Sequence, residues 1–378
     1  MRELELYIHI PFCVQKCGYC DFLSAPATKQ VQNAYMEALL GEIRSADVTD
    51  NIITSVFIGG GTPSTVDSAW IPRLMDTVRR KFTLAGDAEI SMEVNPGTVT
   101  RESLALYRKA GVNRLSIGCQ SADDKELARI GRIHDFSQFL DTYRWAREAG
   151  FANINVDLMS ALPGQSMEDW ERTLEKILAL DPMPEHISAY SLIVEEGTAF
   201  YEQYKAGQLV LPDEDTEREM YWKTAEILQN SGYEHYEISN YARNGYICRH
   251  NCGYWQRANY LGFGIGAASL YQNIRFRNTD SLAEYLEVLA HGSMPERLDI
   301  QKLSVEDQMA ETFILGLRMM EGVDLQEFQE TYGKTAGEVY GDVIRESIEE
   351  GLLERKKSRL VLTKRGVDIC NYIMAKFI

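Results

Sequence analysis

Short apolar runs that alternate with helical patterns constrain the fold of this chain more than any other feature. Six runs of β-branched and aromatic residues end in glycine or polar residues, at 6–10, 55–60, 89–94, 114–118, 153–159 and 186–192. Between them, segments such as 31–46 and 100–111 place apolar residues three and four positions apart, as amphipathic helices do. The repeated strand–helix–strand pattern predicts a parallel sheet covered by helices, because the strands are apolar on both faces. We expect an α/β fold, a partial (β/α)6 TIM-like barrel, and a doubly wound open sheet is the alternative.

The rest of the chain predicts two further parts. Residues 214–233 have the pattern of one amphipathic helix, which would close a barrel core spanning 1–235. Residues 236–300 contain many Gly, Asn and Tyr residues with little periodicity, which is typical of a loop-rich functional segment. Residues 301–378 show helical patterns and then "RKKSRLVLTKRG", which suggests a hairpin wing. We therefore expect a smaller C-terminal helical, winged-helix-like domain.

Charge and composition exclude several classes of function. The chain has 378 residues and a net charge of -17, so it would repel nucleic acid and gain nothing from counterion release. The stretch "ESIEEGLLE" before the wing is acidic where a DNA-recognition helix would be basic, which disfavours a winged-helix regulator. No signal-peptide pattern and no long apolar run is present, so we expect a cytoplasmic protein. The negative net charge does not exclude a peripheral contact between this protein and a membrane complex.

Three of the seven cysteines, Cys13, Cys17 and Cys20, lie at C-x3-C-x2-C spacing. In a reducing compartment this pattern indicates metal or redox chemistry, and cysteines in a structural loop are the alternative. A closed zinc site needs four ligands, and here only His9 could join the three thiols. A 4Fe-4S cluster held by three thiolates leaves one iron open to an exogenous molecule. Because the triplet follows the first strand, we expect the metal at the mouth of the barrel.

The cysteine spacing, with an aromatic residue before the last cysteine, resembles the signature of the radical S-adenosylmethionine (SAM) superfamily. In that superfamily the open iron chelates SAM, and an electron from the cluster cleaves it to a 5'-deoxyadenosyl radical. The segments "YIHIPFC", "GGGTP", "EVNP", "GCQS" and "DLMSALPGQ" look like the oxygen-independent coproporphyrinogen III oxidase family over roughly residues 5–270. The resemblance implies a radical SAM barrel with a 4Fe-4S cluster on the three cysteines.

A set of residues near the strand ends would bind SAM by the same resemblance. They are Tyr7, Tyr19, Gly60, Gly61, Thr62, Glu93, Gln120, Arg132 and Asp157. Glycines at a strand end let a ligand approach the backbone, and Gln120 and Asp157 can accept hydrogen bonds from ribose hydroxyls. Arg132 can bind a carboxylate through two hydrogen bonds. Each residue also has an alternative role that involves no ligand. The glycines would form a tight turn, and Glu93 would cap a helix. Arg132 would lie on the surface, and Tyr7 and Tyr19 would be packing residues.

Two departures from the oxidase favour a different member of its family. The oxidase carries a fourth cysteine two residues after the third, where this chain has Phe22, and a long N-terminal extension, where only six residues precede Tyr7. Both features are similar to the HemW-type radical SAM haem chaperones. The motif "HNCGYW" at 250–255 fits the H-N-x-x-Y-W pattern of that group.

Within this motif, the resemblance implies that His250 binds haem iron and that Tyr254 and Trp255 face the porphyrin. The alternative is a hydrogen-bonded histidine beside two packing aromatics. Cys248 and Cys252 flank His250, but "CRHNC" lacks the spacing of a familiar zinc site. Cys119 and Cys370 are expected to be packing residues.

The resemblance therefore implies a haem chaperone that transfers haem to client haem proteins such as respiratory cytochromes. Its cofactors would be a 4Fe-4S cluster, SAM and haem, and the sequence does not identify the electron donor. The cluster and SAM could gate its conformation or a homodimer. The alternative is an enzyme, an oxygen-independent coproporphyrinogen III oxidase or another radical SAM catalyst acting on tetrapyrroles.

Overall fold

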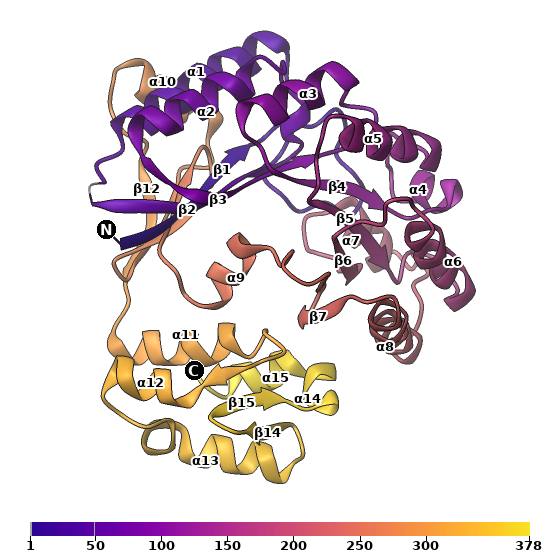
Figure 1. The fold of residues 1–378 in the computed structure, drawn as a ribbon, viewed down its shortest axis with the longest axis vertical. Helices are drawn as coiled ribbons and strands as arrows, with labels where there is room; N and C mark the ends of the chain where they lie inside the picture. Colours follow the sequence, from indigo (N-terminus) through magenta and orange to yellow (C-terminus); the bar gives the residue numbers. More distant parts are fainter. Residues whose placement is uncertain (1, 49) are drawn as a thin grey trace.

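The computed structural model describes residues 2–48 and 50–378, and its N-terminal part is an open barrel of parallel strands (Figure 1). The strands are β1 (Arg2–Ile10), β2 (Asn51–Gly60), β3 (Thr83–Val94), β4 (Arg114–Gln120), β5 (Ile154–Ser160) and β6 (His186–Ser191). They lie side by side in sequence order, and each neighbouring pair is parallel. The predicted partial (β/α)6 barrel is confirmed. The doubly wound alternative is wrong, because the strand order never reverses between β1 and β6.

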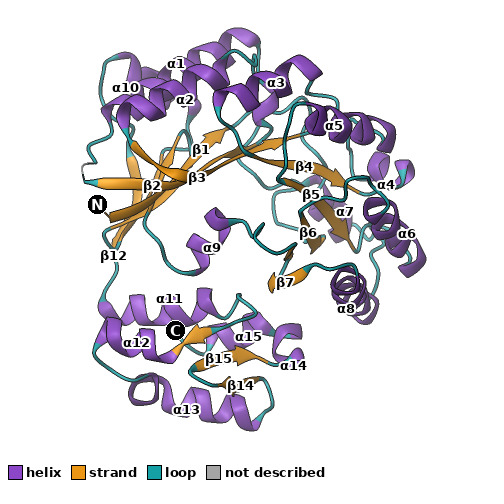
Figure 2. Cartoon of the chain, in the orientation of Figure 1, coloured by secondary structure: helices purple, strands orange, loops and turns teal. Residues whose placement is uncertain are grey.

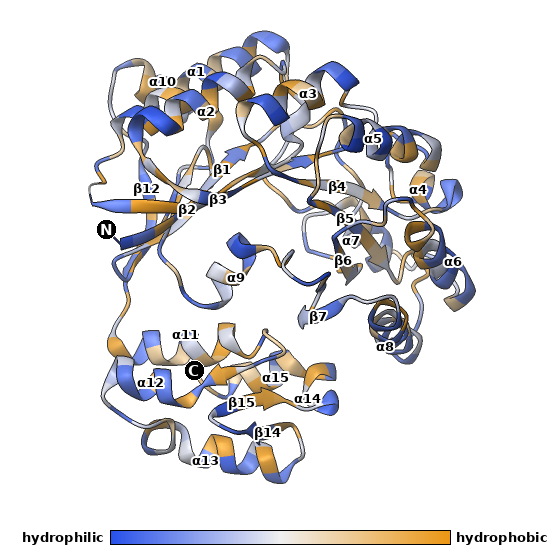
Figure 3. Ribbon diagram, viewed as in Figure 1, coloured by the Kyte–Doolittle hydropathy of each residue, from blue (hydrophilic) through white to orange (hydrophobic). Residues whose placement is uncertain are grey.

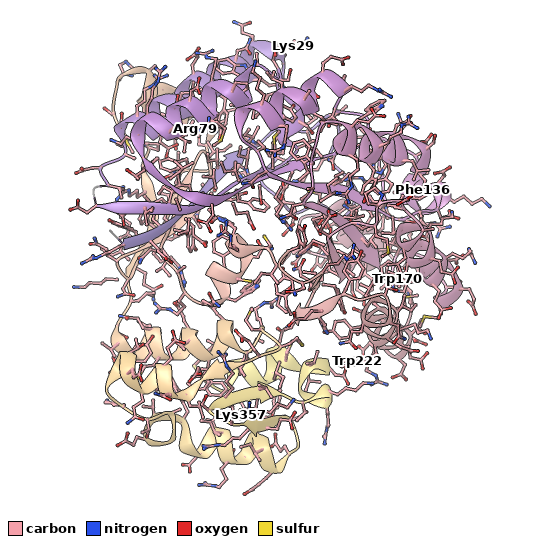
Figure 4. The ribbon with its side chains drawn as sticks, viewed as in Figure 1. Lys29, Arg79, Phe136, Trp170, Trp222 and Lys357 are labelled. Atoms are coloured by element: carbon pink, nitrogen blue, oxygen red, sulfur yellow. The ribbon has the colours of Figure 1, made fainter. Side chains whose placement is uncertain are left out.

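Helices cover the outer face of these strands (Figure 2). They are α1 (Lys29–Ser45), α2 (Trp70–Lys81), α3 (Arg101–Ala110), α4 (Asp124–Arg129), α5 (Phe136–Glu148), α6 (Met167–Leu178) and α8 (Glu214–Asn230). The 3-10 turn η1 (Pro63–Thr65) follows β2, and α7 (Ala199–Lys205) packs against the cysteine loop, where the Phe200 amide donates to the Gly18 carbonyl. Three of the covering helices begin at a capping box, formed by Thr100 for α3, Asp135 for α5 and Ser166 for α6. In Figure 4 Trp170 of α6 lies in the packed layer beside α8, where its indole donates a hydrogen bond to Thr224 (2.8 Å).

Residues 236–300, which the composition predicts to be loop-rich, contribute strands to both edges of the same twelve-stranded sheet. The segments are β7 (Glu234–Glu237), β8 (Asn240–Ala242), α9 (Arg249–Trp255), β9 (Tyr260–Phe263), β10 (Ala268–Tyr271), β11 (Ile274–Asn278), α10 (Leu282–Ala290) and β12 (Arg297–Lys302). β9 runs parallel to β1, while β8 runs antiparallel to β6. These strands have only three to six residues, too few to show a periodic pattern.

The C-terminal region forms a second body with its own hydrophobic core. Its elements are α11 (Val305–Gly316), β13 (Val323–Asp324), α12 (Leu325–Tyr332), α13 (Ala336–Glu349), β14 (Leu353–Lys356), β15 (Arg359–Leu362), α14 (Lys364–Asp368) and α15 (Cys370–Ala375). These elements follow the order of a winged helix, as predicted: a helix, a strand, two helices and a hairpin. Strands β13, β15 and β14 form one sheet. Figure 3 shows hydrophobic residues gathered on the inner faces of these elements.

Helix α9 lies between the concave side of the barrel sheet and the C-terminal domain (Figure 1). Arg257, just after α9, pairs with Glu311 of α11 at 2.8 Å, and both side chains are largely buried. A second link joins Trp222 of α8 to Asp368 of α14 at 2.7 Å. The C-terminal domain is therefore held against the segment that carries the H-N-x-x-Y-W motif. None of the helices within 2–48 and 50–378 is both long and apolar enough to cross a membrane.

Candidate functional site

A cavity of 440 Å³ lies inside the barrel, lined by strands β1 to β6, by the loop after β1 and by α9. The structure brings all of the residues predicted for the cluster and for SAM to this one cavity. They are Tyr7, Cys13, Cys17, Tyr19, Cys20, Gly60, Gly61, Thr62, Glu93, Gln120, Arg132 and Asp157. Parallel strands explain the convergence, since their carboxyl ends share one rim.

The cysteine loop follows β1 directly and folds back on the barrel. The amide of Cys13 donates a hydrogen bond to the carbonyl of Ala25, and the amide of Cys20 donates one to the carbonyl of Cys17. Burial raises the pKa of the Cys13 and Cys20 thiols. A bound cation would reverse this effect, because its charge favours the thiolates that ligate metals.

Cys13, Cys17 and Cys20 all line the cavity, and the fourth zinc ligand that the sequence allows is already engaged. His9, the fourth zinc ligand that the sequence allows, is engaged through both ring nitrogens. Its Nδ1 pairs with the Tyr7 hydroxyl and its Nε2 with the Leu23 carbonyl, each at 2.9 Å. A 4Fe-4S cluster binds each thiolate to a different iron, so its ligands line a cavity and need no common point.

Gly60, the last residue of β2, and Gly61 form one wall of the cavity, and both positions can hold only glycine. Gly60 has φ +124°, and a Cβ there would lie 2.8 Å from His9 Nδ1. A Cβ on Gly61 would lie 2.7 Å from the carbonyl oxygen of Phe12. The Gly60 amide donates to Glu93 Oε2 at 3.1 Å, and the Thr62 hydroxyl accepts from Asn95 at 2.8 Å.

Two buried carboxyl groups share the cavity. Burial and the nearby Asp157 raise the pKa of Glu93 to about 8. Burial also raises the pKa of Asp157, although the Ser116 hydroxyl and the Asn155 amide donate to its two oxygens at 2.9 and 2.6 Å. Both groups would regain their charge beside a cationic ligand, since an opposite charge favours the ionised form.

Arg132 and Gln120 lie on the neighbouring part of the wall. The Arg132 guanidinium donates to Asn95 Oδ1 and to the Gly118 carbonyl, both at 2.8 Å. Its Nε is buried without a partner among the described residues. Gln120 accepts from the Tyr190 hydroxyl at 3.1 Å.

Sequence reasoning missed several polar residues of the cavity, namely Asn95, Arg114, Ser116, Asn155, Ser188 and Tyr190. Asn95 lies within the "EVNP" segment and could have been found from that motif. The others are single polar residues inside strands, which nothing in the sequence separates from ordinary strand positions.

The H-N-x-x-Y-W motif is split between two faces of α9. His250 and Tyr254 line the cavity, whereas Trp255 does not. Trp255 packs with Cys252, Tyr236 and Met319, and the guanidinium of Arg318 lies 4.3 Å from its ring centre. Trp255 therefore belongs to the interface with the C-terminal domain, away from the other two predicted haem contacts.

His250 is 1% exposed and hydrogen-bonded through both ring nitrogens. Nδ1 pairs with the Ser55 hydroxyl at 2.7 Å and Nε2 with the Tyr254 hydroxyl at 2.9 Å, while the ring stacks on Phe57 at 5.2 Å. Burial and the charge of Arg114 lower the pKa of His250 to about 3, so the imidazole is neutral.

Two buried glutamates surround the start of α9. Glu89 accepts from the amide of Arg249 at 2.9 Å and from that of His250 at 3.4 Å. Glu5 Oε2 lies 3.7 Å from His250 Nδ1, and burial together with the charge of Glu89 raises the pKa of Glu5 to about 8.

The remaining cysteines lie apart from the cluster loop. Cys248 and Cys252 are buried thiols with raised pKa values, and the Cys248 thiol lies 3.6 Å from Glu89 Oε1. Cys119 is fully buried in the barrel core, and Cys370 packs against the C-terminal core.

Comparisons with known proteins agree with this geometry. Residues 7–177 match the Radical SAM superfamily, and residues 303–369 match the HemN C-terminal domain. A Bacillus subtilis protein named "Heme chaperone HemW" is 36% identical, covering 98% of both chains. An Escherichia coli protein of the same name is 35% identical, covering 100% of this chain and 99% of its own length.

Among solved structures, the radical SAM enzyme coproporphyrinogen III oxidase (HemN) from Escherichia coli superposes with a TM-score of 0.85. It is 25% identical, and the match covers 100% of this chain and 90% of that one. The chain thus belongs to the radical SAM family of HemW-type haem chaperones, a family that is structurally similar to HemN.

Proposed function

We propose that this protein binds haem and transfers it to client haem proteins, with a 4Fe-4S cluster and SAM in the barrel cavity. The observation that carries the proposal is the match along almost the whole chain to relatives named "Heme chaperone HemW". A respiratory cytochrome is the kind of client that we would test first.

The residues of the cavity fit the two cofactors that the family implies. Cys13, Cys17 and Cys20 would hold three irons, and the fourth iron would supply an open position for SAM. The glycine wall allows a ligand to contact the backbone, and Glu93 and Asp157 offer negative charge to the ammonium and sulfonium groups of SAM.

The cavity is poorly suited to the substrate of the oxidase. Coproporphyrinogen III carries four carboxylates, which proteins usually bind with several Arg or Lys side chains. Among the described residues that line the cavity, the cationic side chains are Lys16, Arg114 and Arg132. Arg132 already donates to Asn95 and Gly118, and Arg114 lies among the charges of Glu89 and Asp157. Phe22 also lines the cavity, at the position where the oxidase family has a cysteine.

The test is a haem titration of anaerobically reconstituted protein beside a coproporphyrinogen III turnover assay. We expect stoichiometric haem binding, no decarboxylation, and haem transfer to an apo-cytochrome at a rate above that of free haem. Turnover of coproporphyrinogen III without haem binding would establish an oxidase instead. The triple variant Cys13→Ser/Cys17→Ser/Cys20→Ser serves as the cluster-free control in each assay.

A further inference from the structure

The middle of the cysteine loop is held by helix α7. Gly18 directly follows Cys17, and its backbone bonds in two directions. The Gly18 amide donates to the Ile130 carbonyl at 3.3 Å, and the Gly18 carbonyl accepts from the Phe200 amide at 2.8 Å. Among the described residues, these are the backbone hydrogen bonds that join the stretch 14–22 to the rest of the barrel. Gly18 is therefore the point at which the fold sets the path of the loop.

The Phe200 ring fills the space that a side chain at position 18 would need. A Cβ on Gly18 would lie 2.5 Å from Phe200 Cε1 and 2.8 Å from Phe200 Cδ1, closer than packed carbon atoms approach. Gly18 is not among the glycines with positive φ, so its backbone conformation is open to any residue. The aromatic ring of α7, and not the backbone, requires glycine at this position.

Phe200 is fixed in turn by a small apolar cluster beneath α7. The ring is 4% exposed. The other buried members of the cluster are Ile130, Met159, Leu162 and Leu192. Such a ring cannot turn aside without opening a cavity, because protein interiors are closely packed. A displacement of Gly18 would therefore have to displace α7 as well.

The two ends of the cysteine loop are held independently of α7. The Cys13 amide donates to the Ala25 carbonyl at 3.3 Å, and His9 Nε2 donates to the Leu23 carbonyl at 2.9 Å. Cys20, by contrast, follows Cys17, because its amide donates to the Cys17 carbonyl at 3.2 Å. Loss of the α7 contact should thus loosen Cys17 and Cys20 together and leave Cys13 in place.

We propose that Phe200 is a positioning residue for the iron–sulfur cluster, and that α7 seats fully on the loop only when Cys17 and Cys20 face the cavity. The inference rests on the proposed function, which puts the cluster on the three cysteines. All three line the cavity, whereas Phe200 does not. Phe200 acts through Gly18 and touches neither the cluster nor SAM.

The coupling works in both directions. If the α7 contact stabilises the cluster-binding form of the loop, cluster binding must stabilise the seated position of α7 by the same free energy. Cluster loading should therefore slow the opening of α7, a change that can be measured without any turnover of SAM or haem.

The first experiment follows the loss of cluster absorption when anaerobically reconstituted full-length protein is mixed with a ferrous chelator. Phe200→Ala should release iron roughly tenfold faster than the wild type, the size expected for a coupling of about 1.4 kcal/mol between contacting residues. Phe200→Leu keeps part of the apolar contact and should be intermediate. The control is Tyr204→Ala on the same helix, at a side chain that is 57% exposed, which should match the wild type.

Gly18→Ala tests the contact from the other side. The added methyl group meets the Phe200 ring, so this variant should also release iron faster than the wild type. In the double variant Gly18→Ala/Phe200→Ala the opposing ring is gone, so iron release should be slower than in Gly18→Ala. If the two changes merely weaken packing, the double variant should be the worst of the three, and that result would overturn the proposal. Circular dichroism checks that each variant folds.

Hydrogen exchange of the wild type, with and without its cluster, tests the reverse direction. Peptides that cover α7 should exchange more slowly in the cluster-loaded protein, while peptides that cover α10 should not change. Equal exchange of α7 in both forms, or wild-type iron release in Phe200→Ala, would overturn the role of Phe200 and leave the proposed function standing. A wild-type protein that binds no cluster would overturn the proposed function itself.

Discussion

The pH dependence of SAM binding follows directly from the buried carboxyl group of Glu93. Its pKa is raised to about 8, first by burial and then by the charge of Asp157. Below pH 8 the ligand-free protein therefore holds Glu93 mostly as the neutral acid. A cationic ligand favours the carboxylate, so its binding releases this proton.

Because binding requires the loss of one proton, SAM affinity should rise with pH up to about 8. Each pH unit well below the pKa is worth about 1.4 kcal/mol, and the effect levels off as Glu93 ionises, so the dissociation constant should fall about 25-fold between pH 6 and pH 7.5. The amino group of SAM stays largely protonated in this window, because α-amino groups titrate at about 7.7 to 8.0.

Isothermal titration of anaerobic, cluster-loaded protein with SAM measures both the affinity and the released proton. Titration in two buffers of different ionisation enthalpy should give about one proton per SAM at pH 6.5. Glu93→Gln should remove that proton and flatten the profile, and any remaining slope would belong to Asp157. Exposed Asp215→Asn on α8 is the control. A flat wild-type profile, or equal slopes in the wild type and Glu93→Gln, would refute the reasoning.

Three further predictions concern the cluster, the glycine wall and the domain interface. The iron–sulfur absorption should be lost in each of the variants Cys13→Ser, Cys17→Ser and Cys20→Ser. The control variant Cys370→Ser should keep it. A full cluster in any of the first three variants would contradict the ligand assignment. Gly60→Ala combines a positive φ with a Cβ placed 2.8 Å from His9 Nδ1, so urea unfolding should show a loss of about 2 to 4 kcal/mol. Gly197→Ala, also at positive φ but with open space around it, should cost less, and equal losses would show that the close contact is unimportant. Glu311→Gln leaves the largely buried Arg257 without its charged partner. The free energy of unfolding should therefore fall by about 3 kcal/mol. The C-terminal domain should also become more sensitive to limited proteolysis. Exposed Glu306→Gln is the matched change, and identical behaviour of the two variants would show that the ion pair does not hold the domain.

Local sequence patterns determined the barrel and most of its cavity. The six strands, their sequential order and the cysteine loop after the first strand follow from periodicity and spacing, which are properties of neighbouring residues. The family resemblance singled out the residues from Tyr7 to Asp157 for SAM, and the parallel strands explain why residues at or near the ends of several strands share one rim. The winged-helix order of the C-terminal domain was predictable for the same reason.

The tertiary structure alone decided the role of the 236–300 segment and of its motif. Its strands are too short for a pattern, and their partners β1 and β6 lie far away in the sequence. Helix α9 has seven residues, and the sequence does not say which side faces the cavity and which faces the C-terminal domain. Packing separates His250 and Tyr254 from Trp255. His250 also finds Ser55 across 195 residues of chain, a contact that only the folded barrel can create.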